Sequence, residues 1–103
     1  MRTFKELHIW KRSVDLASTI DSITQNFPVT ERFGLISQMR RCSISVPSII
    51  GEGAARTSKK EFKQFLDKSN GTFYVLHTQV IISYKLGLID SEEQNKLGTE
   101  IIN

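Results

Sequence analysis

The side chains best suited to do chemistry in this sequence are the basic ones of its middle third. Residues 32–68 carry eight lysines and arginines against three carboxylates, whereas residues 69–103 are acidic overall. The eight basic residues are Arg32, Arg40, Arg41, Arg56, Lys59, Lys60, Lys63 and Lys68. An uneven charge of this kind favours an anionic partner.

Four of these cations are spaced to share one face at the start of a predicted helix: Arg56, Lys59, Lys60 and Lys63. Positive charge near a helix N-terminus is unfavourable, and a bound anion would relieve that cost while using the free backbone amides. The pair Arg40 and Arg41 is expected one helix away. We therefore predict that all six side chains bind nucleic acid, either RNA or single-stranded DNA.

A simpler interpretation of the same charges remains open. The basic stripe could be a solvated face that serves solubility or subunit pairing, with Glu52 and Arg56 paired at i,i+4. No base-reading module is visible in the sequence, so specific recognition of bases is not indicated.

No combination of residues indicates catalysis or a metal site. His8 and His77 fall on different predicted helices without a metal-binding spacing. Glu92 and Glu93 are neighbours in sequence and point in different directions on a helix. We expect no catalytic residue, no metal and no cofactor, and the chain is not predicted to be an enzyme.

The single cysteine, Cys42, has no partner for a C-x-x-C motif. Arg40 and Arg41 precede it and could lower its pKa. Its position on an apolar helical stripe instead favours a thiol packed in the core.

Length and composition indicate one soluble domain over residues 1–103. Hydrophobic residues make up 39% and charged residues 24% of the chain, which is ordinary for a globular protein. The charged N-terminal segment does not resemble a signal peptide, and no apolar run approaches the roughly 20 residues of a membrane span. With one cysteine, these features predict a cytoplasmic protein without a membrane partner.

Apolar periodicity predicts two helices in the first half. The first covers about residues 6–26, with a core stripe of Leu7, Trp10, Val14, Ala17 and Ile20, and ends at Phe27-Pro28. The second begins near Thr30, which is expected to cap it. Pro47 should kink this helix or break it, and the continuing apolar period favours a kink. Gly53 should close it with a positive φ.

The second half predicts one long and one short helix. Ser58 and Glu61 form a capping box for a helix that ends at Gly87, and Gly71 suggests that another backbone passes close by. Its core stripe includes Phe62, Leu76 and Val80. A second apolar stripe is formed by Phe65, Val75, Ile82 and Leu86, which we predict to be an oligomer interface.

The fourth helix starts at Asp90 with a D-x-x-E box to Glu93, and Leu97 and Ile101 could face the core. The resulting fold class is all-α: an up-down-up-down four-helix bundle with a short fourth helix.

Motifs along nearly the whole chain support a family resemblance. They are Phe4-x-x-Leu7-x-Ile9-Trp10, Phe27-Pro28-x-x-Glu31-x-Phe33-Gly34-Leu35, Gln38-x-Arg40-Arg41, Ser45-Val46-Pro47-Ser48, Gly51-Glu52-Gly53, Arg56-x-Ser58 and Phe62-x-x-Phe65-Leu66. The chain resembles the four-helix-bundle proteins encoded in intervening sequences of bacterial 23S rRNA genes, which are similar in fold to the accessory variability determinants of diversity-generating retroelements. The resemblance implies a four-helix bundle that assembles into a homopentameric barrel. The retroelement relatives bind a reverse transcriptase and nucleic acid, so these are the partners that the similarity suggests.

Two hypotheses for function follow. The first is a non-enzymatic, self-assembling scaffold whose basic surface binds RNA or single-stranded DNA, as an accessory to a nucleic-acid enzyme such as a reverse transcriptase. The second is an oligomeric protein-protein adaptor that binds no nucleic acid. Salt dependence separates them, because phosphate binding weakens steeply as salt rises.

Overall fold

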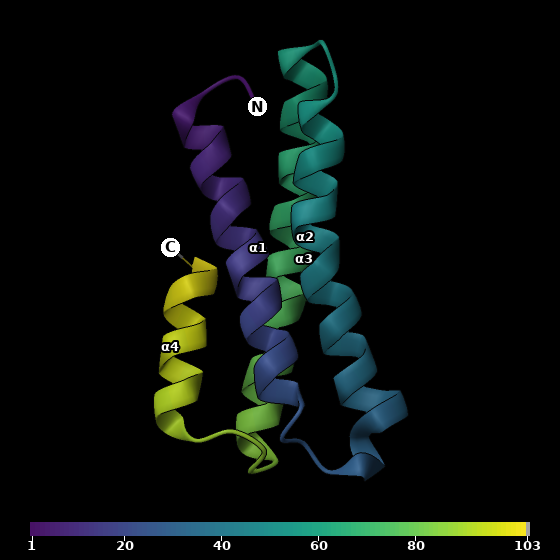
Figure 1. The fold of residues 1–103 in the computed structure, drawn as a ribbon, viewed down its shortest axis with the longest axis vertical. Helices are drawn as coiled ribbons and strands as arrows, with labels where there is room; N and C mark the ends of the chain where they lie inside the picture. The colour runs from purple at the N-terminus through teal and green to yellow at the C-terminus, as the bar shows by residue number, and fades with distance from the viewer. Residues whose placement is uncertain (103) are drawn as a thin grey trace.

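The structure is a computed structural model that describes residues 1–102, and the side chains of residues 1–99. It has four α-helices: α1 (Phe4–Thr24), α2 (Ser37–Ala54), α3 (Lys59–Lys85) and α4 (Ser91–Ile102). They run alternately down and up, and α4 covers only the lower part of the bundle (Figure 1). The described residues form no strand. The predicted all-α class and the short fourth helix are therefore confirmed.

The first helix starts earlier than the sequence indicated. Thr3 caps α1 by accepting a hydrogen bond from the Glu6 amide (3.1 Å), and the Thr3 amide donates to the Glu6 carboxylate (3.2 Å). This is a complete capping box, and it satisfies two backbone donors that would otherwise lack partners. It also orders the residues that precede the helix.

The core stripe of α1 is rotated from the predicted one. Its buried residues are Ser13, Leu16, Ile20 and Thr24, whereas Val14 is exposed. The hydroxyls of Ser13 and Thr24 donate to backbone carbonyls within the helix, so both polar groups are satisfied inside the core. The apolar periodicity did not reveal this because small hydroxyl residues count as polar in the pattern.

The connection between α1 and α2 corrects the predicted cap. Thr30 lies inside a 3-10 turn, Val29–Glu31, which a π-helical turn, Arg32–Ile36, joins to α2. The backbone amide of Ser37, where α2 begins, donates to the carbonyl of Gly34. Thr30 lies within the 3-10 turn, and the backbone is kinked at the non-helical Gly34 before α2 begins, so Thr30 is not the cap of α2 and that prediction was wrong.

The predictions for Gly53 and Gly71 were wrong, whereas Pro47 lies within a helix that continues past it, as the apolar period indicated. Pro47 lies within α2, which continues to Ala54. Gly53 is inside α2 with a negative φ, because the only positive φ among the described residues is at Gly87. A Cβ on Gly53 would lie 2.5 Å from the Cβ of Phe65, so close helix packing explains this glycine. Gly71 has no atom within 4 Å of its Cβ position, so no second backbone passes there.

The main core lies in the half of the bundle where all four helices meet. Its buried members are Leu16, Ile20, Phe27, Met39, Leu76, Val80, Ile89 and Leu97. Asp90 and Glu93 form the predicted capping box of α4 in both directions (2.7 and 3.0 Å), which orients Leu97 into the core. Ile101 lies outside the described side chains.

Candidate functional site

The cations predicted at the start of α3 gather at one end of the bundle. Ser58 caps α3 through the Glu61 amide (3.3 Å), and Phe62 is buried one turn later. The α2–α3 turn is closed by bonds from the amides of Ala55 and Arg56 to carbonyls of α2. This short turn holds Arg56 close to Lys59, Lys60 and Lys63.

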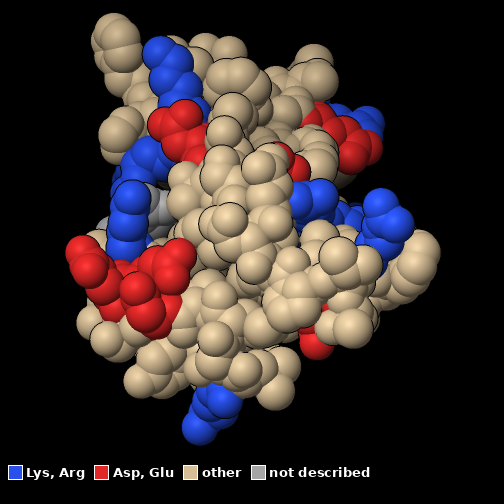
Figure 2. All heavy atoms as spheres, turned by 60° about the horizontal axis from the view of Figure 1, so that its bottom comes forward, with Lys and Arg blue, Asp and Glu red and all other residues tan. Residues whose placement is uncertain are grey.

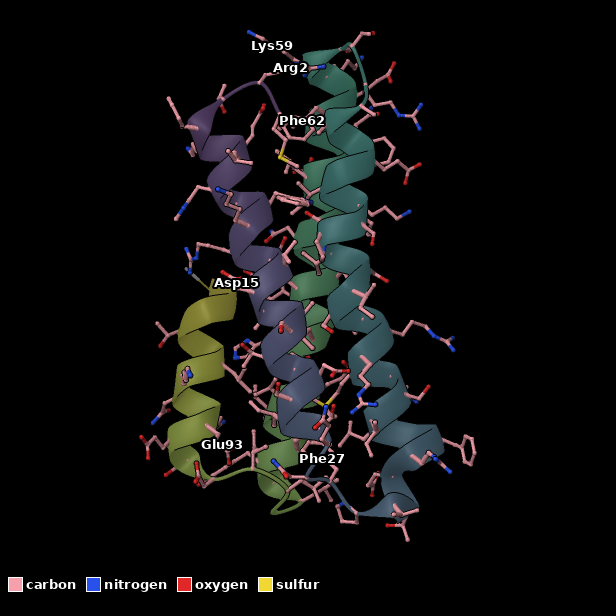
Figure 3. The ribbon with its side chains drawn as sticks, viewed as in Figure 1. Arg2, Asp15, Phe27, Lys59, Phe62 and Glu93 are labelled. Carbon is pink, nitrogen blue, oxygen red and sulfur yellow. The ribbon has the colours of Figure 1, made fainter. Side chains whose placement is uncertain are left out.

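A fifth cation joins this group, and the sequence reasoning missed it. The guanidinium of Arg2 donates a hydrogen bond to the carbonyl oxygen of Arg56. Figure 3 labels Arg2 and Lys59 at the same end of the bundle. The T-x-x-E box at residues 3–6 indicates an ordered start of α1, but it does not show that Arg2 lies beside Arg56, which is far away in sequence. We call Arg2, Arg56, Lys59, Lys60 and Lys63 the basic end.

The members of the basic end differ in how they are held. Arg56 pairs with Glu52 at 3.4 Å, as predicted for i,i+4, and its guanidinium lies 5.1 Å from the centre of the Phe65 ring. The three lysines are exposed, and they form no ion pair with the described residues. Arg56 is therefore a fixed cation, whereas the lysines are free to meet an anion.

Arg40 and Arg41 do not belong to the basic end. They lie in the first turns of α2, so about 20 Å of helix separates them from Arg56. Arg40 is half-buried and donates through Nε to Thr24 Oγ1 (2.8 Å), with Asp21 at 3.4 Å. Arg41 is exposed on a different face of the helix. The six predicted side chains thus form two separate groups.

The predicted outward stripe of α3 is largely exposed. Val75, Ile82 and Leu86 are 52%, 42% and 59% exposed, whereas Phe65 is half-buried against Gly53. Gln79 lies in the same stripe, at a 4-3-4 spacing with the other three. Its Oε1 is buried and accepts no hydrogen bond from the described residues. Three exposed apolar side chains along one stripe are typical of a surface that a further chain covers.

The thiol of Cys42 is packed between two helices. Cys42 is half-buried between α2 and α3, where its Sγ donates to the Thr72 carbonyl (3.4 Å) and burial raises the pKa of the thiol. The neighbouring arginines therefore do not lower it, in agreement with a packed thiol. Among the residues described, no three His, Cys, Asp or Glu side chains group around a possible metal position.

The fold and its basic end define a class: a small antiparallel helical bundle with charge concentrated at one helix turn. The comparison with protein families then identifies it. The model of the 23S rRNA-intervening sequence protein family matches residues 5–103, so the chain belongs to that family. A search of curated proteins found no match. Within the described part of the chain, none of the helices has the length and apolarity needed to cross a bilayer.

Proposed function

We propose that this chain is a cytoplasmic, non-enzymatic scaffold that self-assembles and binds RNA or single-stranded DNA through its basic end. The observation that carries the proposal is the convergence of two segments distant in sequence on one site. Arg2 precedes α1 and Arg56 precedes α3, yet the Arg2 guanidinium donates to the Arg56 carbonyl, and three exposed lysines follow in the first two turns of α3. The phosphate backbone is the anion that such a site would meet most often, and it binds mainly through charge.

Self-assembly would multiply this weak site. The exposed stripe of Val75, Ile82 and Leu86 could bury its apolar surface against another subunit. In a ring of identical chains, such as the homopentamer that the resemblance implies, the basic ends would repeat. Repeated contacts along one strand raise the overall affinity without any new type of contact.

A charge reversal tests nucleic-acid binding. Lys59→Glu with Lys60→Glu should weaken binding of a labelled single-stranded RNA by about 100-fold or more at low salt, because charge supplies most of the affinity. Lys85→Glu with Lys96→Glu makes the same charge change at exposed positions outside the basic end and should bind nearly as well as the parent. Equal losses in the two variants would reject the basic end as the site.

A second pair of variants tests assembly. Ile82→Asp should shift the native mass toward the single chain, whereas Asn70→Asp, at an exposed site on another face of α3, should not. Native mass spectrometry of protein purified without nuclease measures both the number of subunits and any bound nucleic acid.

An oligomer without nucleic acid would favour the alternative function, a protein-protein adaptor, for which the same exposed apolar stripe is the supporting observation. An accessory role beside a reverse transcriptase would then also lose its basis.

A further inference from the structure

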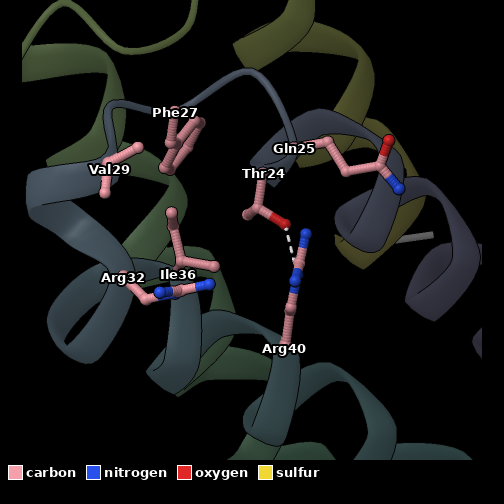
Figure 4. Close-up of a pocket in the computed structure, with 7 residues that line it drawn as sticks. All are labelled: Thr24, Gln25, Phe27, Val29, Arg32, Ile36 and Arg40. Carbon is pink, nitrogen blue, oxygen red and sulfur yellow. Dashed lines mark hydrogen bonds between the residues drawn. The ribbon is translucent and has the colours of Figure 1, made fainter.

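A pocket lies at the end of the bundle opposite to the basic end, where α1 leads into α2. Its volume is about 460 Å³, which falls within the range of small-molecule sites. Figure 4 shows its lining: Thr24, Gln25, Phe27, Val29, Arg32, Ile36 and Arg40. We propose that this pocket binds a small organic oxyanion, a carboxylate or phosphate carried on an apolar body.

The local fold brings two arginines to one pocket. Arg32, Ile36 and Arg40 follow one another at four-residue steps along the π-helical turn and the start of α2. Figure 4 shows the two arginine side chains on either side of Ile36. The backbone leaves helical geometry at Gly34 (φ −104°, ψ −106°), and this kink sets the direction of Arg32 relative to Arg40.

One of the two arginines is held in place. Arg40 donates through Nε to Thr24 Oγ1 (2.8 Å) and through one Nη to the Asp21 carbonyl (3.3 Å), and Thr24 is itself buried. No hydrogen bond to a described residue uses its other Nη. A guanidinium fixed on one edge retains donors for an oxyanion on the other, which lowers the entropy lost on binding.

The other arginine supplies the uncompensated charge. Arg32 is exposed and forms no ion pair with the described residues, and the one carboxylate paired with Arg40 is that of Asp21. Two guanidiniums against one carboxylate leave a net charge of about +1, which matches a monoanion. Arginines that line a pocket can bind a carboxylate or phosphate through two N–H groups at once.

The rest of the lining is apolar and suits the body of the ligand. Phe27 is buried and Ile36 is half-buried, so the floor is fixed by the core, whereas Val29 is exposed at the rim. An inorganic anion would leave this surface uncovered, and a neutral apolar molecule would leave the arginines unused. Only a ligand with both parts uses the whole pocket.

Four probes and amide NMR shifts of the full chain test the proposal. Benzoate and phenyl phosphate carry both parts, benzyl alcohol lacks the charge, and inorganic phosphate lacks the apolar body. The first two should shift the amides of Thr24, Gln25 and Ile36 at millimolar concentration, with affinities at least about tenfold above those of the last two. Equal affinity for phenyl phosphate and inorganic phosphate would overturn the proposal, as would the absence of shifts at these amides.

A matched pair of variants completes the test. Arg32→Gln should weaken benzoate binding by about tenfold, because it removes the uncompensated charge from an exposed position without touching the core. Arg41→Gln removes the same charge from α2 outside the pocket and should leave the affinity unchanged. Equal effects of the two substitutions would show that net charge alone attracts the probe, and the pocket would be rejected.

Discussion

The two ends of α2 are connected to the neighbouring helices in different ways. At its C-terminal end a turn of a few residues leads to α3, Ser58 caps the new helix, and Gly53 packs against Phe65. At its N-terminal end the chain passes through a 3-10 turn and a π-helical turn before α2 begins. Figure 2 brings this second end forward, and uncharged atoms fill much of the centre of the view, with charged side chains toward its edges.

Because the two connections differ in length, the two ends of the bundle offer different kinds of binding surface. In the tight turn the amides of Ala55 and Arg56 bond to carbonyls of α2, and Ser58 caps α3, so the basic end offers exposed charge on an ordered support. The longer connection leaves space between its turns and the core, so it offers a pocket. Each end therefore suits a different kind of anion: an extended polyanion at the first and a small amphipathic one at the second.

The largest expected effect is on stability at the pocket end. Phe27 is 6% exposed and Phe33 is 90% exposed, although the same connection holds both. Phe27→Ala should cost about 3–5 kcal/mol of unfolding free energy in urea denaturation, because it opens a cavity in the core. Phe33→Ala should stay within about 0.5 kcal/mol of the parent. A similar loss in both variants would mean that Phe33 is covered in solution.

The next largest effect on stability is expected where the C-terminal end of α2 packs against α3. Gly53→Ala should destabilise the chain by about 1–3 kcal/mol, because the new Cβ would meet Phe65 and the helices would have to move apart. Gly71→Ala adds the same methyl group where no atom lies within 4 Å, so it should stabilise α3 by about 1 kcal/mol. If Gly53→Ala also stabilised the chain in urea denaturation, the close crossing of α2 and α3 would be wrong.

Removal of a helix cap should have a smaller effect on the unfolding free energy. Thr3 caps α1, whereas Thr30 caps no helix, so the two threonines can be compared. Thr3→Ala should cost about 1 kcal/mol, because it removes the cap of α1. Thr30→Ala should change the unfolding free energy by less than about 0.5 kcal/mol, because Thr30 caps nothing. Thermal unfolding followed by circular dichroism measures both, and a larger loss for Thr30→Ala would restore the cap that the sequence predicted.

The smallest expected effect is on the pH dependence of the unfolding free energy, and it comes from Cys42 in the middle of the bundle. Burial raises the pKa of the folded thiol above its ordinary value of 9.0, so the folded state holds its proton more tightly than the unfolded state. The stability from this difference is complete below pH 9.0 and is lost as pH rises through the folded pKa. The unfolding free energy of the parent should fall more steeply above pH 9.0 than that of Cys42→Ala. Parallel curves would contradict the shift.

Local rules predicted most of the fold. The Ser58 cap, the Asp90 capping box, the helix end at Gly87 and the short fourth helix follow from interactions between near neighbours in sequence. The box predicted at Ser58 is only half formed, because no bond from the Ser58 amide to the Glu61 carboxylate occurs among the described residues. The misplaced cap at Thr30 has a different origin, because a hydroxyl before an apolar run is equally compatible with a 3-10 turn. The sequence predicted a turn with positive φ at Gly53. The glycine is needed instead because Phe65, on another helix, packs against it, and a local pattern does not contain that contact.

The candidate site was predictable only in part. Spacing along α3 was enough to group Lys59, Lys60 and Lys63. Arg2 could not be grouped with them from charge counts, because its position depends on how the N-terminal segment folds over the turn. Arg40 and Arg41 were added on charge alone, and the length of α2 then separates them from the others. Distances between helices are set by tertiary packing, which a one-dimensional pattern does not contain.

The most direct test of the account compares the lysines of the protein with one another. A lysine-acetylating reagent is applied with and without a single-stranded RNA, and the modification of each lysine is measured by mass spectrometry. Protection of Lys59, Lys60 and Lys63, with Lys85 and Lys96 unchanged and with loss of protection at high salt, is the predicted result. Equal protection of all lysines, or protection confined to Lys85 and Lys96, would contradict a nucleic-acid site at the basic end.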